Sequence, residues 1–150
     1  MPILTLTARR DLDAAPDALE LNFRSSDSAK RQILKSVDLD KLRGRWVDVE
    51  VRTHYKDQTG YLNVHMTDVQ TGEAILRYTR AQIDMYRVGN ELVRPKWGIY
   101  RSLKAPEHLR NERVLFADFC IAEGSDTCSG TSVVLNQNET SVLRSSKQRY

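Results

Sequence analysis

The chain has 150 residues, of which 40% are hydrophobic and 29% charged, which is enough for one globular domain with a sizeable core. Its net charge of +3 is mild and lacks the clustering typical of nucleic-acid binders. No apolar run approaches the roughly 20 residues of a transmembrane helix, so we expect neither a nucleic acid nor a membrane as partner.

The first quarter of the chain alternates between apolar and polar residues, as half-buried strands do. Ile3–Arg9 and Ala18–Phe23 are predicted to form a hairpin. Arg31–Val37 fits either a short strand or a helical turn, and Asp38–Leu42 is predicted to be a helical turn.

The middle of the chain contains the clearest strands. Arg45–His54, Tyr61–Thr67 and Glu73–Arg80 are predicted strands, separated by turns at Lys56–Gly60 and Thr71–Gly72. If the valines of the first strand face inward, its outward side chains include Glu50 and Arg52. On the second strand the outward side chains are Tyr61, Asn63 and His65.

The densest stretch is Val93–Ser102, with two aromatic residues, three cations, a proline and a glycine. As a strand it places Arg94, Lys96 and Tyr100 on one face, with Lys96 and Tyr100 roughly 13 Å apart. Gly98 between them would let a ligand approach the backbone. The same pattern also fits an ordinary half-buried strand with a solvated cationic face.

The last third is less regular. Ala105–Asn111 fits a short helix or a loop, and Glu112–Ala122 is predicted to be the final strand. Residues 123–150 lack clean periodicity, so we expect a weakly ordered tail behind a domain of residues 1–122. Many short strands with regular turns favour an all-β sandwich of the jelly-roll type.

The octapeptide Pro95–Ser102 resembles the signature strand of polysaccharide lyases of the fungal glucuronan-lyase type, and more distantly of heparin-lyase-I-like and alginate lyases. Weaker similarity lies in Ile3–Ala8, Gly44–Val47 and Phe116–Phe119, so the resemblance covers residues 2–122. It implies a concanavalin-like β-jelly-roll sandwich, an acidic polysaccharide as partner, and secretion. Calcium is a candidate cofactor by the same resemblance, although its ligands are not identifiable and no metal site is predicted.

The reaction implied is β-elimination at a uronic acid, in which a base removes the C5 proton and an acid protonates the departing C4 oxygen. The resemblance makes Tyr100 the catalytic tyrosine, because nearby cations can lower the pKa of a phenol. Lys96 would bind the substrate on the same face. The other predicted substrate-binding residues are Arg52, Asn63, His65 and Arg94.

One departure from the family weakens this assignment. Lyases of this type carry a Gln, and often a His, on a strand upstream of the one that Ile3–Ala8 resembles, and here the chain begins just after that point. We therefore expect an incomplete sandwich with an open edge or a bare apolar face. Three hypotheses remain: a lyase, whole or degraded; a non-catalytic carbohydrate-binding sandwich; and a sandwich fragment with neither property.

The two cysteines, Cys120 and Cys128, are close enough in sequence to form a local disulfide. Together with a glycosylation sequon at Asn138, such a bridge would fit an extracellular origin, although no signal peptide precedes Ile3. The alternative is a pair of free thiols in a cytosolic protein.

Overall fold

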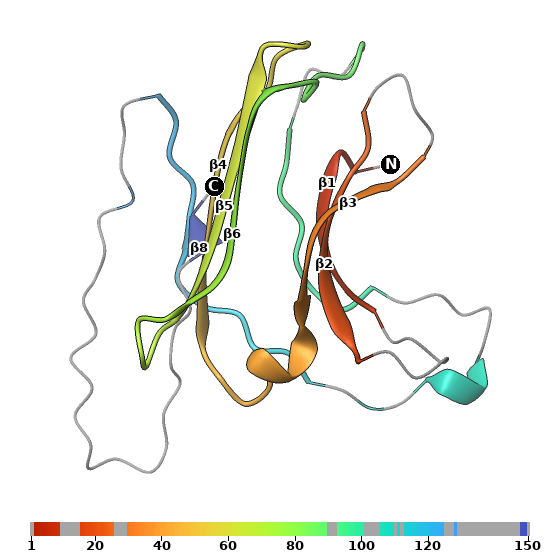
Figure 1. Ribbon diagram of the computed structural model, residues 1–150, viewed down its shortest axis with the longest axis vertical. Coiled ribbons are helices and arrows are strands. Elements are labelled where there is room, and N and C mark those ends of the chain that lie inside the picture. Colours follow the sequence, from red (N-terminus) through yellow and green to blue (C-terminus); the bar gives the residue numbers. More distant parts are fainter. Residues whose placement is uncertain are drawn as a thin grey trace.

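The computed structural model describes residues 2–9, 16–25, 30–89, 93–100, 106–109, 111, 113–124, 128 and 148–149. Within these residues the structure is all-β, and two sheets face each other as the layers of a sandwich (Figure 1). The only helical elements described are single 3₁₀ turns, η1 at Leu39–Lys41 and η2 at Pro106–His108. The prediction of an all-β protein is therefore confirmed.

The first sheet is an antiparallel meander of β1 (Leu4–Arg9), β2 (Ala18–Phe23) and β3 (Gln32–Asp38). The predicted hairpin is confirmed, and β3 resolves the open choice at Arg31–Val37 in favour of a strand. The turn η1 follows β3 directly. The side chain of Asp38 caps η1 by accepting a hydrogen bond from the Asp40 backbone N–H, 2.9 Å.

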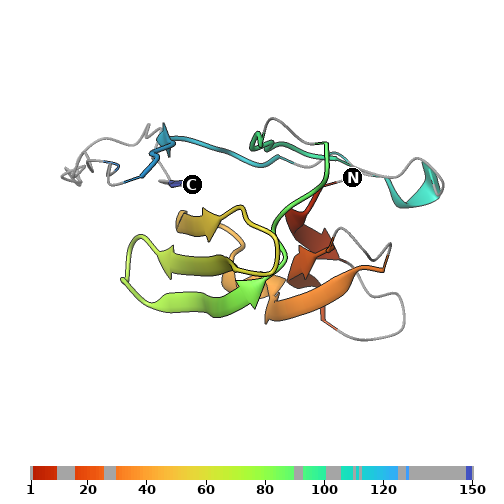
Figure 2. The same ribbon diagram turned by 90° about the horizontal axis from the view of Figure 1, so that it is seen from above.

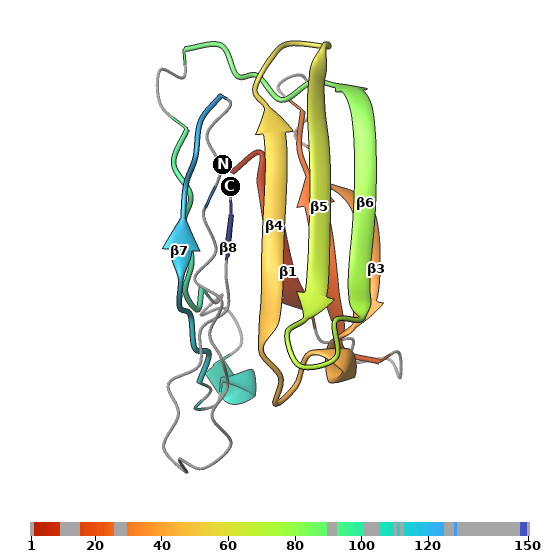
Figure 3. The same cartoon turned by 90° about the vertical axis from the view of Figure 1, so that its left-hand side faces the viewer.

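The second sheet is built on β4 (Val47–His54), β5 (Gly60–Asp68) and β6 (Ala74–Ile83), paired antiparallel in chain order. At the far edge of β4 two short strands continue the sheet, β8 (Gln148–Arg149) and then β7 (Phe119–Cys120), both in parallel pairing. Figure 3 views this sheet from outside, with β6 at one edge and β7 at the other.

The core lies between the two sheets, where alternate residues of each strand point inward. Leu21 and Phe23 come from β2, and the buried side chains opposite them are Val51, Leu62, Val64, Met66, Leu76, Ile83 and Met85. The inward set Leu62, Val64 and Met66 was expected from the sequence and is confirmed. Fully burying one such side chain contributes about 1.5–3 kcal/mol, so this cluster is the main source of stability among the described residues.

The two sides of the sandwich, where the edges of the two sheets lie, are covered by different parts of the chain. β6 lies beside β3, whereas the chain that follows β6 passes to the opposite side, next to β4 and β1 (Figure 2). On leaving the sandwich this chain is held by two hydrogen bonds, from Met85 N–H to the Lys56 carbonyl at 3.1 Å and from the Arg87 guanidinium to the Arg24 carbonyl at 3.2 Å.

The predicted strand at Val93–Ser102 is wrong over Val93–Tyr100, which is extended irregular chain without strand pairing; the last two positions lie outside the described residues. Pro95 has no N–H to donate to a ladder, and Gly98 has φ +130°, outside the strand region. Within the described residues 113–122, the predicted final strand Glu112–Ala122 is reduced to the two residues of β7, and Asp118 directly before β7 adopts φ +53°.

The disulfide between Cys120 and Cys128 is confirmed, with their Cα atoms 5.8 Å apart. The open choice at Ala105–Asn111 resolves in its described part to the single turn η2. Most of the expected tail lies outside the described residues, although β8 within it pairs with β4 and β7.

Candidate functional site

The outer face of β4, β5 and β6 is a regular grid of polar side chains. Strand register places one residue from each strand in a row, and residues two apart along a strand lie about 7 Å apart. No other described segment lies in front of these three strands when the sheet is viewed from outside (Figure 3). The rows are Glu50, His65 and Arg77; then Arg52, Asn63 and Thr79; then His54, Tyr61 and Ala81.

Two polar contacts organise the first two rows. On β4, the Arg52 Nε donates to the Glu50 carboxylate at 2.7 Å, so this cation is balanced by an acid on its own strand. Between β5 and β6, the Arg77 Nε donates to His65 Nε2 at 3.1 Å. The Thr67 hydroxyl lies 3.5 Å from the same ring nitrogen.

The contact with Arg77 determines the state of the His65 ring. A guanidinium can only donate hydrogen bonds, so Nε2 must accept, and the ring proton then resides on Nδ1. The half-buried imidazole lies between the acid on β4 and the cation on β6. In this arrangement its Nδ1–H is a hydrogen-bond donor.

Three of the six predicted site residues share this face: Arg52, Asn63 and His65. The other three, Arg94, Lys96 and Tyr100, lie on the irregular segment on the β4 side of the sandwich (Figures 2 and 3). Tyr100 is fully exposed. The expectation that one strand would place Lys96 and Tyr100 on the same concave face is wrong for this structure, because that strand does not form.

The irregular segment presents apolar rather than cationic packing. Trp97 stacks on Phe119 with ring centroids 4.0 Å apart and planes 19° apart, and Phe116 lies 6.3 Å from Phe119. All three rings are at least 40% exposed. These rings do not test the expectation of an incomplete sandwich with an open edge or a bare apolar face, which stays a prediction.

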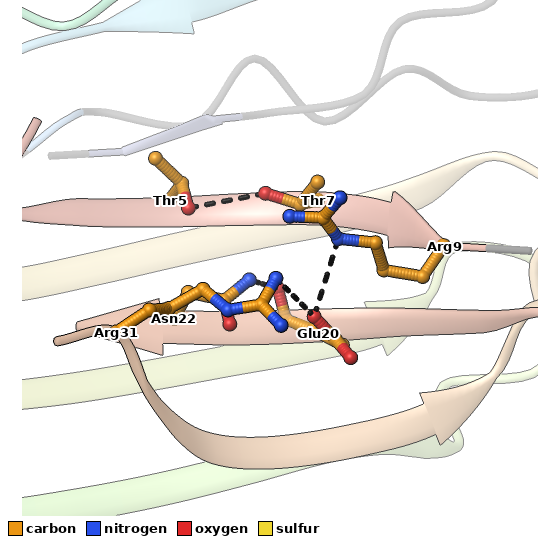
Figure 4. Close-up of polar contacts among 6 residues, drawn as sticks. All are labelled: Thr5, Thr7, Arg9, Glu20, Asn22 and Arg31. Atoms are coloured by element: carbon orange, nitrogen blue, oxygen red, sulfur yellow. Dashed lines mark hydrogen bonds and ion pairs between the residues drawn. The ribbon is translucent and has the colours of Figure 1, made fainter. Parts of the chain in front are cut away.

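The outer face of the first sheet offers a second polar surface for comparison (Figure 4). Its carboxylate at Glu20 receives two cations, Arg9 at 3.5 Å and Arg31 at 3.2 Å. On the neighbouring strand the Thr7 hydroxyl donates to the Thr5 hydroxyl at 3.1 Å. Both cations of this cluster already contact an acid, so they are poorer candidates for recognising an anionic ligand.

Asp68 at the end of β5 is a structural anchor that sequence reasoning missed. Its buried carboxylate accepts hydrogen bonds from the backbone N–H groups of Gln70 and Thr71, at 2.8 and 3.0 Å, and from Arg45 at 2.9 Å. The hydrogen bond from Thr71, followed by that from Arg45, lowers the pKa of this carboxyl group. Asp68 therefore shapes the β5–β6 turn and ties it to the chain before β4.

Other candidate chemistry is sparse in the described part of the chain. Burial raises the pKa of the Tyr55 phenol, which makes it a poor base at neutral pH. No three His, Cys, Asp or Glu side chains of the described residues gather closely enough to hold a metal ion. No helix among the described residues is long and apolar enough to cross a membrane.

Arg77 is a charged member of this face that the sequence prediction left out. The alternation of Leu76 and Tyr78 with Arg77 and Thr79 was the available signal, because it places the latter pair outward. Asn63 and His65 were found by the same argument on the preceding strand.

Comparison with known proteins gives no match: no family model, no curated protein and no solved structure is similar to this chain. The resemblance to glucuronan lyases therefore rests on its residues alone.

Proposed function

We propose that this protein binds an acidic polysaccharide of the polyuronate type on the outer face of β4, β5 and β6. The observation that carries the proposal is the three-row polar grid, uncovered by other described segments and containing Arg77 beside a neutral His65. Cations, an amide and hydroxyl groups are the side chains that a polymer with one carboxylate and several hydroxyls per sugar requires.

The grid also has suitable dimensions. Three strands at about 4.8 Å spacing give a surface about 10 Å wide, and three rows at about 7 Å extend it along the strands. A polysaccharide chain could therefore contact several rows at once. The mild positive charge of the chain adds long-range attraction for a polyanion.

A second candidate function is β-elimination by Tyr100, as in glucuronan lyases. It is favoured by the octapeptide Pro95–Ser102 and by the fully exposed phenol of Tyr100. It requires Val93–Ser102 to pair as a strand within a concanavalin-like jelly roll, so that Lys96 and Tyr100 join the polar grid. Among the described residues, the pairs along this edge of β4 are Val49 with Gln148 and Glu50 with Arg149.

Secretion is the localisation that accompanies both functions. The disulfide between Cys120 and Cys128 supports it, because such bridges persist in oxidising compartments. Calcium remains a candidate cofactor by resemblance alone.

Binding and turnover are tested separately. Calorimetric titration with glucuronan, against a neutral glucan as control, measures binding, and ultraviolet absorbance of the C4–C5 double bond measures elimination. We expect this chain to bind glucuronan and not the neutral glucan, with little or no unsaturated product. Absence of binding to any polyuronate would contradict the proposal.

Turnover has its own variant. If unsaturated product forms, Tyr100→Phe should abolish it and leave binding nearly intact, because only the hydroxyl is removed. Lys96→Ala should weaken binding, most strongly at low salt. Product formed equally fast by Tyr100→Phe would show that Tyr100 is not the catalytic residue.

A further inference from the structure

We infer that Arg77, oriented by His65, is the group that recognises the uronate carboxylate of the bound polymer. This inference rests on the proposed function, because it names the contact through which the polar face would select an acidic sugar. Arg77 is exposed on β6, and its Nε is fixed by the 3.1 Å hydrogen bond to His65.

Charge balance singles out Arg77 on this face. Arg52 is paired with Glu50 on its own strand, whereas no described carboxylate lies within ion-pairing distance of the Arg77 guanidinium. On the other sheet Arg9 and Arg31 share Glu20 (Figure 4), and near the turns Arg45 contacts Asp68. Arg77 is thus the cation of the grid whose charge is left for a ligand.

The hydrogen bond to His65 leaves the two terminal nitrogens of Arg77 for that ligand. A guanidinium held through Nε presents its NH1 and NH2 groups as a planar fork, which matches the two oxygens of a carboxylate. Because the acceptor is an imidazole nitrogen and not a carboxylate, the hydrogen bond restrains the Arg77 guanidinium without pairing its positive charge with an acid.

The neighbouring side chains direct the carboxylate to this position. On β4, Glu50 lies in the same row beyond His65 and would repel an anion there, so the acidic group of the sugar is favoured at the β6 end. In the next row Asn63 and Thr79 offer neutral hydrogen-bonding groups for hydroxyls. One uncompensated cation suits a sugar with one carboxylate better than a multiply sulfated one.

Arg80 provides a matched control. It is also an exposed arginine of β6, but it lies in the row of Thr53 and Leu62, on the opposite face of the sheet. Arg77→Gln and Arg80→Gln therefore remove the same charge from the same strand and differ only in the face affected.

The test is calorimetric titration of the full chain and both variants with glucuronan and with carboxyl-reduced glucuronan, which keeps the backbone and lacks the charge. We expect Arg77→Gln to weaken glucuronan binding about tenfold or more, as loss of a charge-assisted contact does, and Arg80→Gln to change it less than about twofold. Arg77→Lys should recover part of the affinity, because it keeps the charge and loses the fork. The carboxyl-reduced polymer should not distinguish the variants.

Two outcomes separate the possible failures. No binding of glucuronan by the unaltered chain would overturn the proposed function itself. Binding that Arg77→Gln and Arg80→Gln weaken equally would leave that function standing and overturn the role of Arg77, because total charge would then suffice. Urea unfolding of both variants establishes that the comparison is made between folded proteins.

The positioning role of His65 has an independent readout. Nitrogen NMR of the imidazole should show a neutral ring protonated at Nδ1, and in Arg77→Gln the two tautomers should become more evenly populated. His65→Phe, which cannot accept a hydrogen bond, should weaken glucuronan binding severalfold, whereas His65→Gln should retain most of it. A ring protonated at Nε2 in the unaltered chain would overturn this arrangement.

Discussion

Residues 2–89 and residues 93–124 differ in how completely their apolar side chains are covered. The first region pairs every strand with a neighbour in sequence and buries Leu62, Val64 and Met85 completely. The described part of the second contains a single strand, of two residues, and leaves Trp97 and Ile121 at least 40% exposed. Alternation of apolar and polar residues is present in both, so alternation alone does not make a strand: Pro95 lacks the N–H that a ladder needs, and Gly98 has a φ outside the strand region.

The comparison is tested most strongly by truncating the core of the first region. Leu62→Ala removes a fully buried side chain from β5, which is paired on both edges, and should lower the free energy of unfolding by about 3 kcal/mol, because lost burial and the remaining cavity both count. Urea denaturation followed by circular dichroism measures this change. A loss below about 1 kcal/mol would indicate that the region is not tightly packed.

A somewhat smaller loss of stability is expected when Gly60, at the start of β5, is replaced. A Cβ atom there would lie 2.6 Å from the Ile83 carbonyl oxygen and 2.7 Å from that of His54. These are backbone atoms that cannot simply rotate away, so Gly60→Ala should destabilise the protein by about 2 kcal/mol. Gly72→Ala is a useful contrast, because a Cβ there meets no atom within 4 Å, although its φ of +74° adds some strain. Equal losses for the two would contradict the steric explanation.

Replacing Asp68 should lower the stability of the protein over only part of the pH range. Its pKa is lowered in the folded state, so its contribution to stability is present above the unfolded value of about 3.9 and is lost as the pH falls through the folded value. Asp68→Asn should therefore be less stable than the unaltered chain at neutral pH, and the two should converge as the pH falls through the lowered folded pKa of Asp68. Urea midpoints between pH 2 and pH 7 measure this; a constant difference would show that the charge is not involved.

The smallest effect is expected in the second region. Trp97→Ala removes a ring that stacks on Phe119 but remains 44% exposed, so the cost should be below about 1 kcal/mol despite the size of the side chain. Trp46 remains as a fluorescent reporter of unfolding in this variant. A loss comparable to that of Leu62→Ala would mean that residues 93–124 unfold together with the sandwich.

Sequence reasoning succeeded where local pattern and tertiary pairing agree. The strands around Leu21, Val51 and Val64 were predicted within a few residues, because each alternates and is followed by a turn to an adjacent partner. It failed at Val93–Tyr100, since alternation there does not reveal that Pro95 and Gly98 disrupt a ladder.

For the candidate site, the sequence predicted which residues of β5 face outward but not their contacts. Asn63 and His65 follow from period-two alternation, whereas the bond from Arg77 depends on the register of β6 against β5, which is shifted by irregularities at both ends of the pairing. The ion pair between Arg45 and Asp68 joins two separate segments of the chain, so a local sequence pattern could not predict it either.

The pairing of β4 with β8 has a consequence for the order of folding. Val49 pairs with Gln148, 99 positions further along the chain, whereas His54 and Tyr61 of the β4–β5 hairpin are separated by one short turn. Closing the longer loop costs about 2.5 kcal/mol more in chain entropy. The two residue pairs between β4 and β8 should therefore form only after the hairpins have closed. During synthesis on the ribosome, this part of the β4 edge would stay open until Gln148 and Arg149 emerge. In that interval the nascent chain is most exposed to edge-to-edge association with its neighbours.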